Sequence, residues 1–334
     1  MYKGSKKNGL PAKPSLYRDI LKILERFSLN KSKRIGTTIN KIRKLKSLKI
    51  KDITNNGQIL SKSAYYRFVN GESNIQATQF MNLLFRLNTS LKEFEFIHND
   101  YQLPKVEQIL QLVLTAASKQ DIHTLKKLSS QAKNNFSKTN SYQYQHLLIT
   151  IELFIHKLEG IQVGITNPSL TPDLQTGVDN IVHYLLNLEL WSEYDIVICN
   201  NIYFAISVNQ RSILLNTAIK CFKKYQTFTS ETSQFFMFLS NLIFLDVQTS
   251  QVKNIPSIYN NMCNIPLSPN WTTEPLVLKF CQGLNDYLLG IDRSLTYCEN
   301  AINIASELQV SVWVQNFTLI LDTFKHTIKK YESR

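Results

Sequence analysis

Apolar residues recur at intervals of three and four along almost the whole chain, which is the spacing of amphipathic helices. The pattern predicts five short helices between Arg34 and Phe96, of which the third runs from Ser61 to Asn70. Glycine and proline are scarce, at 10 and 9 among 334 residues, so long helices are favoured over many tight turns. We therefore expect an all-α protein.

Helix boundaries in this first part carry capping residues. Gly71 follows the third helix, where a glycine readily takes the left-handed conformation of a C-terminal cap. Ser73 with Gln76 is a capping-box pattern that would open the fourth helix, and Ser90 with Glu93 repeats it for the fifth. Together with the apolar positions inside each helix, these caps predict one small helical domain.

The rest of the chain, from residue 104 to residue 334, is predicted to be a succession of helices with short breaks. Two helices recur in about 35–45 residues, which is typical of stacked helical hairpins of the tetratricopeptide kind, and such hairpins form an α-solenoid. The consensus residues of that repeat are not readable here. The expected helices span 105–118, 121–135, 139–159, 174–190, 193–207, 210–227, 231–249, 253–264, 274–289, 294–307 and 311–331.

Net charge separates the two parts of the chain. Up to Asp100 there are 20 Lys or Arg against 7 Asp or Glu, and from Tyr101 onwards there are 18 of each, so the whole net charge of +13 lies in the first part. A basic module joined to a neutral one indicates a polyanion-binding head on a body with another task. We expect a basic N-terminal extension over 1–33, a head over 34–100 and a helical body over 104–334.

The extension contains one further amphipathic pattern, between Pro14 and Leu29. Its apolar face suggests a helix that packs on its own domain or on a dimer partner. Because the extension is basic, an arm that contacts DNA is the alternative. The pattern does not decide between the two.

Composition excludes several other classes of protein. The longest apolar stretch, Phe235 to Leu245, is too short to span a bilayer, and five cysteines without metal-binding spacing fit reduced thiols in a cytoplasm. The six histidines are scattered, and no HExxH, GxSxG or phosphate-binding loop motif occurs. We expect no catalytic residues, no metal, no cofactor and no enzymatic activity.

The second and third helices of the head have the form of a helix-turn-helix, whose second member lies in the major groove of DNA. Its outward positions are Lys62, Ser63, Tyr66 and Arg67, which can reach base edges or phosphates. The surrounding cations suit phosphate neutralisation, and they are Lys41, Arg43, Lys44, Lys46, Lys49 and Lys51. The alternative for Arg67 is an ion pair within the domain or stacking on Tyr66, and for the whole face a solvated charged surface.

Three asparagines lie in strongly apolar helices of the body, namely Asn201, Asn241 and Asn285. A carboxamide offers donors and an acceptor, so it can bind the backbone of an extended peptide in the groove of a helical array. The alternative for each is a bond to a neighbouring helix, because burying an Asn without a partner costs about 1–3 kcal/mol. Asn201 has the spacing to share a helix face with Phe204.

The head contains the motifs LSKS, RF and GES, followed by a leucine-rich helix and a Leu-x-x-Phe ending. With these motifs it resembles the DNA-binding head of the Rgg/MutR family of Gram-positive regulators. The stretch LWSEYDIVICNNIYFAIS, from Leu190 to Ser207, resembles the segment where that family has Trp-x-x-Tyr-acidic-Ile and then an Asn. The resemblance implies a head of the phage-repressor class on a tetratricopeptide-like body. It also implies a homodimer and, in many members, control by a short secreted peptide pheromone that is re-imported.

The resemblance also suggests ligand-binding positions. Asn201 and Asn241 match peptide-contacting asparagines of relatives, whereas Phe204 and Val113 stand where some relatives have peptide-binding arginines. A groove without those cations is expected to prefer a short apolar peptide over an acidic one. Asn285 is a further peptide-binding candidate, and the only reason for it is that Asn285 lies in an apolar helix.

In the head, Ala64, Val69 and Ile50 depart from the residues common in relatives, which puts the operator sequence in doubt more than the fold. The leading hypothesis is a cytoplasmic, dimeric, sequence-specific DNA-binding transcriptional regulator that is controlled by a short peptide. The alternative is a DNA-binding regulator whose helical body only dimerises or recruits a protein partner. The operator, the peptide and the direction of control stay open.

Overall fold

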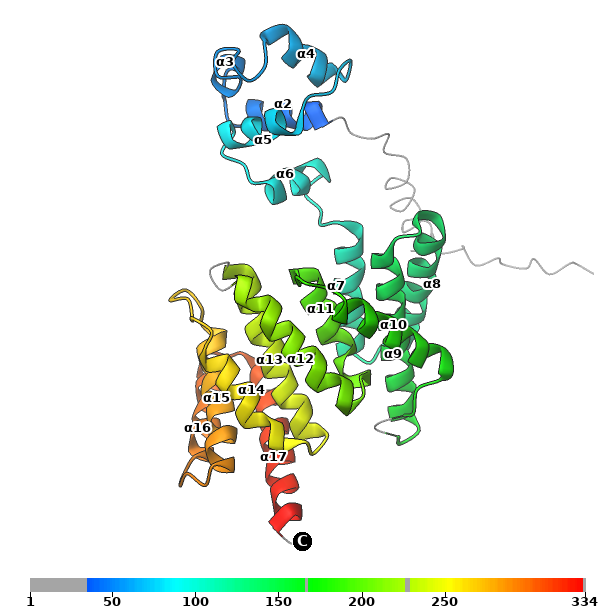
Figure 1. Ribbon diagram of the computed structural model, residues 1–334, viewed down its shortest axis with the longest axis vertical. Coiled ribbons are helices and arrows are strands. Elements are labelled where there is room, and N and C mark those ends of the chain that lie inside the picture. Colours follow the sequence, from blue (N-terminus) through cyan, green and yellow to red (C-terminus); the bar gives the residue numbers. More distant parts are fainter. Residues whose placement is uncertain (1–34, 166–167, 226–228, 333–334) are drawn as a thin grey trace, which may run out of the picture. The chain divides into compact units, whose positions relative to one another are not determined.

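The computed structural model describes residues 35–165, 168–225 and 229–332, and every element in them is a helix (Figure 1). This confirms the all-α expectation. The chain divides into two compact units, Met1–Gln108 and Ile109–Arg334. The helix predicted between Pro14 and Leu29 lies outside the described residues.

The described part of the first unit contains the five expected short helices. They are α2 (Ile35–Leu45), α3 (Ile50–Ile53), α4 (Lys62–Asn70), α5 (Ala77–Arg86) and α6 (Leu91–His98). One apolar core joins them, made of Ile39, Ile42, Ile53, Leu60, Tyr65, Phe68, Leu83, Leu84, Leu87 and Phe94. Each core residue lies on the inward stripe of its helix or in the turn just before or after one, so burying this stripe holds the short helices together.

Two of the three predicted caps occur where they were expected. Gly71 ends α4 with a φ of 68°, and at the start of α6 the backbone N–H of Ser90 donates to the Glu93 carboxylate at 2.7 Å. The capping box at Ser73 is wrong. Helix α5 begins three residues later, at Ala77, where the N–H of Gln76 donates to the side chain of Gln79 at 3.0 Å.

Helices α2 and α4 approach each other closely because Gly36 has no side chain. A methyl group there would lie 2.8 Å from Cα of Val69, and closer still to the carbonyl oxygen of Phe68. Next to this contact, the Tyr65 hydroxyl donates to the Asn40 carboxamide oxygen at 3.2 Å. The close approach and the hydrogen bond together fix the position of α4 on the head.

From residue 105 onwards the chain is a series of helices with short connections, which matches the α-solenoid expectation, and each predicted span corresponds to one α-helix. They are α7 (Lys105–Ser118), α8 (Ile122–Thr139), α9 (Tyr142–Gln162), α10 (Pro172–Leu186), α11 (Glu193–Ile202), α12 (Val208–Phe222), α13 (Thr229–Gln248), α14 (Ile255–Cys263), α15 (Thr273–Leu288), α16 (Leu295–Glu307) and α17 (Ser311–Glu332). None of the described helices is long and apolar enough to cross a membrane.

Consecutive helices pack as pairs, such as α8 with α9 and α15 with α16, while α13 contacts α11, α14, α15 and α17 (Figure 1). The longest apolar stretch of the sequence, Phe235 to Leu245, lies in α13. Its apolar composition is explained by these contacts, because they bury most of the side chains of the stretch. Between Phe235 and Val247, all of which are described, Asn241 is the one exposed residue. Within this stretch of α13, a polar side chain is therefore exposed at a single place.

The motif WSEYD fastens α11 to two neighbouring helices. The carboxylate of Asp195 accepts hydrogen bonds from the Tyr184 hydroxyl of α10 at 2.7 Å and from the N–H of Ser192 at 2.8 Å. The Tyr194 hydroxyl lies 2.9 Å from Nδ1 of His146 on α9. Because these groups are largely buried and hydrogen-bonded, they fix the position of α11 and of the residues that follow it.

The sequence prediction of one helix over residues 193–207 is wrong at its end. Helix α11 stops at Ile202 and is followed by a 3₁₀ turn, η1 (Tyr203–Ala205), before α12 begins. In a 3₁₀ turn, side chains three residues apart lie above one another instead of rotating round the helix. Residues 203–205 therefore do not continue the α-helical turn of α11.

Candidate functional site

Helix α4 presents the four predicted DNA-contacting side chains on its exposed side. Lys62, Ser63, Tyr66 and Arg67 are all exposed, whereas Tyr65 on the other side of the helix is buried in the core. The helix has a polar N-terminal cap, since Oγ of Ser61 accepts from the N–H of Ala64. An exposed, capped and basic helix of this kind has the form that enters a major groove.

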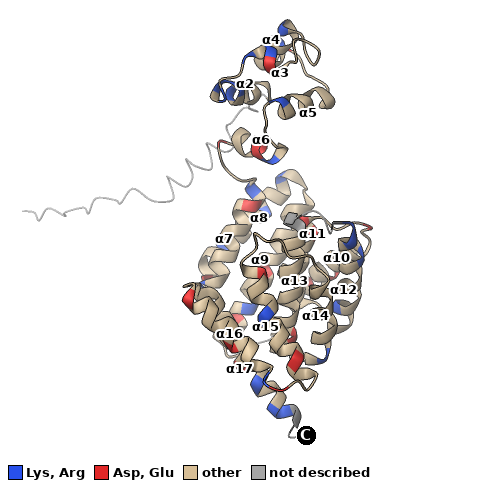
Figure 2. Cartoon of the chain, turned by 90° about the vertical axis from the view of Figure 1, so that its left-hand side faces the viewer, with Lys and Arg blue, Asp and Glu red and all other residues tan. Residues whose placement is uncertain are grey.

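The cations around α4 divide into two groups. Lys41, Lys44, Lys49 and Lys51 are exposed, and Nζ of Lys41 also lies 4.7 Å from the ring centroid of Tyr101. Figure 2 shows the Lys and Arg positions of α2 in blue. These four lysines can neutralise phosphates. The remaining two behave differently.

Lys46 and Arg43 are used inside the head. Nζ of Lys46 donates to the carbonyl oxygens of Leu87 at 2.6 Å and Asn88 at 2.8 Å, which satisfies the C-terminal end of α5. Nε of Arg43 donates to the Asn40 carboxamide at 3.1 Å. Of the six cations predicted to neutralise phosphates, these two therefore form hydrogen bonds within the head. The other four remain candidates for phosphate contacts.

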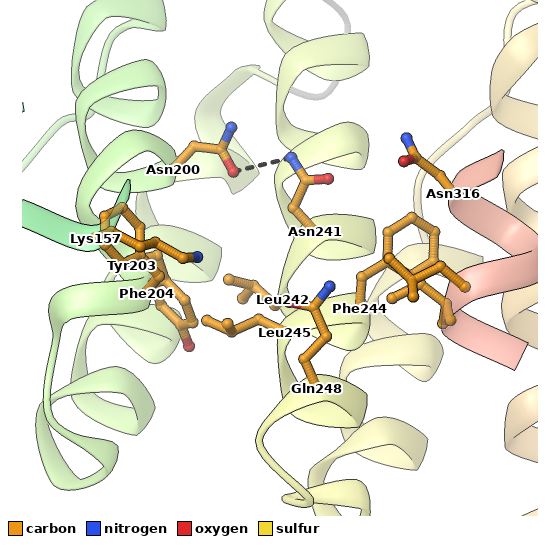
Figure 3. Close-up of a pocket in the computed structure, with 12 residues that line it drawn as sticks. Lys157, Asn200, Tyr203, Phe204, Asn241, Leu242, Phe244, Leu245, Gln248 and Asn316 are labelled. Atoms are coloured by element: carbon orange, nitrogen blue, oxygen red, sulfur yellow. Dashed lines mark hydrogen bonds between the residues drawn. The ribbon is translucent and has the colours of Figure 1, made fainter. Parts of the chain in front are cut away.

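The body contains a pocket of about 280 Å³ lined by twelve residues (Figure 3). Its residues come from α9, α11, η1, α13 and α17. Four carboxamides point towards it, and they are Asn200, Asn241, Gln248 and Asn316. Its apolar surface consists of Leu242, Phe244, Leu245, Leu319 and Ile320, with Tyr203 and Phe204 at one side. The combination of apolar walls and convergent polar groups is typical of a ligand site.

One hydrogen bond joins two of these carboxamides across neighbouring helices. Nδ2 of Asn241 on α13 donates to Oδ1 of Asn200 on α11 at 3.0 Å. Each carboxamide keeps further donor and acceptor capacity for a ligand, because the bond uses one N–H of Asn241 and one lone pair of Asn200. The pair can therefore offer both donors and acceptors to a peptide backbone.

Lys157 is the one charged residue among the twelve that line the pocket. Its ammonium group lies 4.5 Å from the ring centroid of Phe204, and that ring stacks on Phe154 with centroids 5.9 Å apart. Partial burial lowers the pKa of Lys157 below the ordinary lysine value. The sequence analysis did not select this residue, although it is the one lysine in α9.

The structure brings together some of the predicted peptide-binding residues but not all. Phe204 and Asn241 line the pocket, whereas the neighbour Asn200 takes the place expected of Asn201. Asn285 is buried in α15, where its Nδ2 donates to the Asp286 carboxylate at 2.9 Å. Val113 is fully buried in α7. Asn201, Asn285 and Val113 do not line this pocket.

The expectation of a groove without cations also needs correction. That expectation came from Phe204 and Val113, which stand at positions where the resemblance implies arginines in some relatives, but Lys157 brings a cation to the pocket from α9. The inferred preference for an apolar over an acidic peptide depended on having no such charge. Because Lys157 lines the pocket, the expected preference for an apolar peptide is no longer supported.

Residues 122–318, more than half of the chain, match the family described as "HTH-type transcriptional regulator Rgg, C-terminal domain". Solved structures of similar fold include a transcriptional regulator from Listeria monocytogenes EGD-e, with 17% identity, a TM-score of 0.74, and 90% of this chain and 99% of that chain covered. Another is the SHP pheromone receptor Rgg2 of Streptococcus dysgalactiae, with 18% identity, a TM-score of 0.66, and 89% and 99% covered.

The complex of PrgX with cCF10 is also similar, at 15% identity and a TM-score of 0.63, with 88% of this chain and 93% of that chain covered. At such identities these structures support the fold, while the family match covers ten of the twelve residues that line the pocket. The matched segment includes the WSEYD motif. The chain therefore belongs to the Rgg family of helix-turn-helix transcriptional regulators.

Proposed function

We propose that this protein is a sequence-specific DNA-binding regulator whose activity is controlled by a short peptide bound in the pocket of its body. The observation that carries the proposal is the convergence of Asn200, Asn241 and Asn316, from three different helices, on one pocket with apolar walls. An extended peptide needs partners for its backbone groups and apolar surface for its side chains, and this pocket offers both.

The DNA-binding part of the proposal uses the exposed face of α4. In this proposal Lys62, Ser63, Tyr66 and Arg67 contact base edges or phosphates, and Lys41 and Lys49 contact phosphates. Over residues 35–100 the head has ten Lys or Arg against five Asp or Glu, so a positive field also supports association with duplex DNA.

The peptide part is supported by likeness to receptors of known ligand. The similar structures include one described as an SHP pheromone receptor and one of PrgX bound to cCF10. The pocket volume of about 280 Å³ suits part of a short peptide, with the remainder lying outside. Phe204 and Asn241 are retained from the sequence prediction as peptide contacts.

We further infer a homodimer in the cytoplasm. Two heads would read half-sites about one helical turn, roughly 34–36 Å, apart.

All five cysteines are free thiols, which supports a reducing compartment. A peptide that binds one arrangement of the dimer better than another would shift the population between them and alter DNA binding.

The test is a genomic footprint of the protein in cells that express it, with and without supernatant from their own culture. Footprints that move or change occupancy with supernatant support peptide control. Footprints that are the same in both conditions contradict the peptide part and favour a body that only dimerises or recruits a partner. Failure to find any protected duplex contradicts the DNA-binding part.

A further inference from the structure

Lys157 is a partly buried cation without an internal carboxylate. The two acidic residues nearest to it along α9 are directed towards α8. Glu159 pairs with Lys126 at 2.7 Å, and Glu152 accepts a hydrogen bond from Ser129. Among the described residues no ion pair involves Lys157. Removing an ammonium group from water without an anion is unfavourable, so a bound carboxylate would offset that cost.

The position of Lys157 is fixed by aromatic packing. Its ammonium group lies over the ring of Phe204, which in turn stacks on Phe154 of the same helix as the lysine. The contact with the ring holds the cation at the side of the pocket instead of letting it extend into solvent. A held cation recognises an anion at lower entropic cost than a mobile one.

Asn241 and Asn316 stand away from this cation, whereas Asn200 lies on its side of the pocket. In Figure 3, Lys157 and Phe204 lie on one side of the pocket and Asn316 on the other, with Asn241 between them. A chain laid across α13 would therefore meet amide groups along its length and a single positive charge at one side. Since no acidic residue lines the pocket, the field there favours an anion.

The geometry points to Lys157 as a carboxylate-binding residue that sets the direction of the peptide in the pocket. The carboxylate can come from the C-terminus of the peptide or from an Asp or Glu side chain, because both present the same group. The inference rests on the proposed function, since it names the chemistry of the ligand bound by that pocket. It replaces the expectation of a purely apolar ligand.

The experiment uses the full-length protein and three synthetic octapeptide libraries built from Leu, Ile, Val, Phe, Gly and Ser. One library has a free C-terminal carboxylate, the second is C-terminally amidated, and the third is amidated with one Asp at a varied position. Peptides captured on immobilised protein above empty resin are sequenced by mass spectrometry. The enriched peptides are then titrated as matched acid and amide, or as Asp and Asn, by calorimetry.

The variants are Lys157→Met, which keeps the apolar stem over Phe204, and Lys157→Arg, which keeps the charge. Lys133→Met is the matched control, because it removes an exposed lysine from α8 outside the pocket. Thermal unfolding of each variant shows whether it is folded. Because the methionine stem can fill the same space, we expect the Lys157 variants to fold.

We expect a captured carboxylate peptide to lose about tenfold or more in affinity when its carboxylate becomes an amide, since hydrogen bonds to charged groups are strong. Lys157→Met should cause the same loss, while Lys157→Arg and Lys133→Met should retain binding.

Enrichment of the first library identifies a C-terminal carboxylate, and enrichment of the third identifies an acidic side chain. Equal affinity for acid and amide, or unchanged binding by Lys157→Met, overturns the inference and leaves the proposed function standing. Capture from none of the libraries overturns both.

Discussion

The carboxamide nitrogen of Asn241 donates to the carboxamide oxygen of Asn200 at 3.0 Å, and this bond links α13 to α11 at the pocket. Asn241 is exposed although the residues around it in α13 are almost all buried. An exposed side chain in the middle of a buried stretch contributes little to the core. Its role is more readily explained by what binds in the pocket.

Replacement of Asn241 by alanine is expected to weaken peptide binding by about fivefold to tenfold, since one neutral hydrogen bond contributes about 0.5–1.5 kcal/mol. The free energy of unfolding should change by no more than about 0.5 kcal/mol, because the side chain is exposed. Calorimetric titration with a captured peptide and denaturant unfolding measure the two quantities.

Two alanine variants serve as controls for Asn241. Asn303→Ala removes an exposed carboxamide of α16 and should change neither quantity. Asn285→Ala removes a buried one and should lower the free energy of unfolding by about 1–2 kcal/mol with unchanged affinity. If Asn285→Ala weakened binding as much as Asn241→Ala did, the pocket would be wrongly placed.

In the head, Arg67→Ala and Lys62→Ala are expected to reduce discrimination between operator and random duplex. A base contact contributes about 1–3 kcal/mol of that discrimination. Lys49→Ala should instead weaken binding to both duplexes and lower the salt dependence of log Kd by about one. Competition binding at several salt concentrations separates the two behaviours, with Lys92→Ala on α6 as an exposed control. An equal loss on both duplexes for Arg67→Ala would remove it from the base contacts.

Gly36→Ala is expected to separate α2 from α4, since the added methyl group would meet the backbone of Phe68 and Val69. Overpacking of this kind costs about 1–3 kcal/mol. We expect loss of DNA binding and earlier unfolding of the head, while peptide binding by the body is kept. Leu45→Ala, at an exposed position at the other end of α2, is the control. Normal DNA affinity in Gly36→Ala would mean that the close approach of these helices does not position α4.

Asp246 provides a prediction about pH. Burial raises the pKa of its carboxyl group from 3.8 to about 6, against the lowering effects of Asn254 and Arg211. The folded state thus holds this proton more tightly than the unfolded state does. The resulting contribution to stability is present below pH 3.8 and is lost as the pH rises to about 6, by roughly 2–3 kcal/mol.

The isosteric variant Asp246→Asn should therefore lack this pH dependence. The free energy of unfolding of the wild type, relative to that of the variant, is expected to fall between about pH 4 and pH 6 and to stay constant above. Denaturant unfolding of both proteins across this range measures the difference. A difference that rises with pH would show that the ionised carboxylate is the stabilising form.

Local patterns were enough to predict most of the helices. The caps at Gly71 and Ser90 depend on a few neighbouring residues, so the sequence alone identified them. The start of α5 was misplaced because Gln79 both caps Gln76 and donates to the carbonyl of Ile59 at 3.0 Å. That second bond depends on a tertiary contact, which propensity rules do not include.

The pocket was harder to predict for the same reason. Helical spacing puts both Asn200, four positions before Phe204, and Asn201, three positions before it, near the same face, so the spacing did not choose between them. The packing of α11 against its neighbours brings Asn200 to the pocket. Lys157 lies 47 positions before Phe204 in the chain, and only the fold brings them together. The available signal was that Lys157 is the one lysine of α9.

The central claim is that the basic head binds duplex phosphates while the neutral body binds the controlling ligand. The most direct measurement is the Kd of the full-length protein for the duplex upstream of its own coding sequence, taken over a range of KCl concentrations with and without a captured peptide. We predict that log Kd rises linearly with log salt and that the peptide shifts the whole line. Absent or salt-independent binding to that duplex would contradict the account.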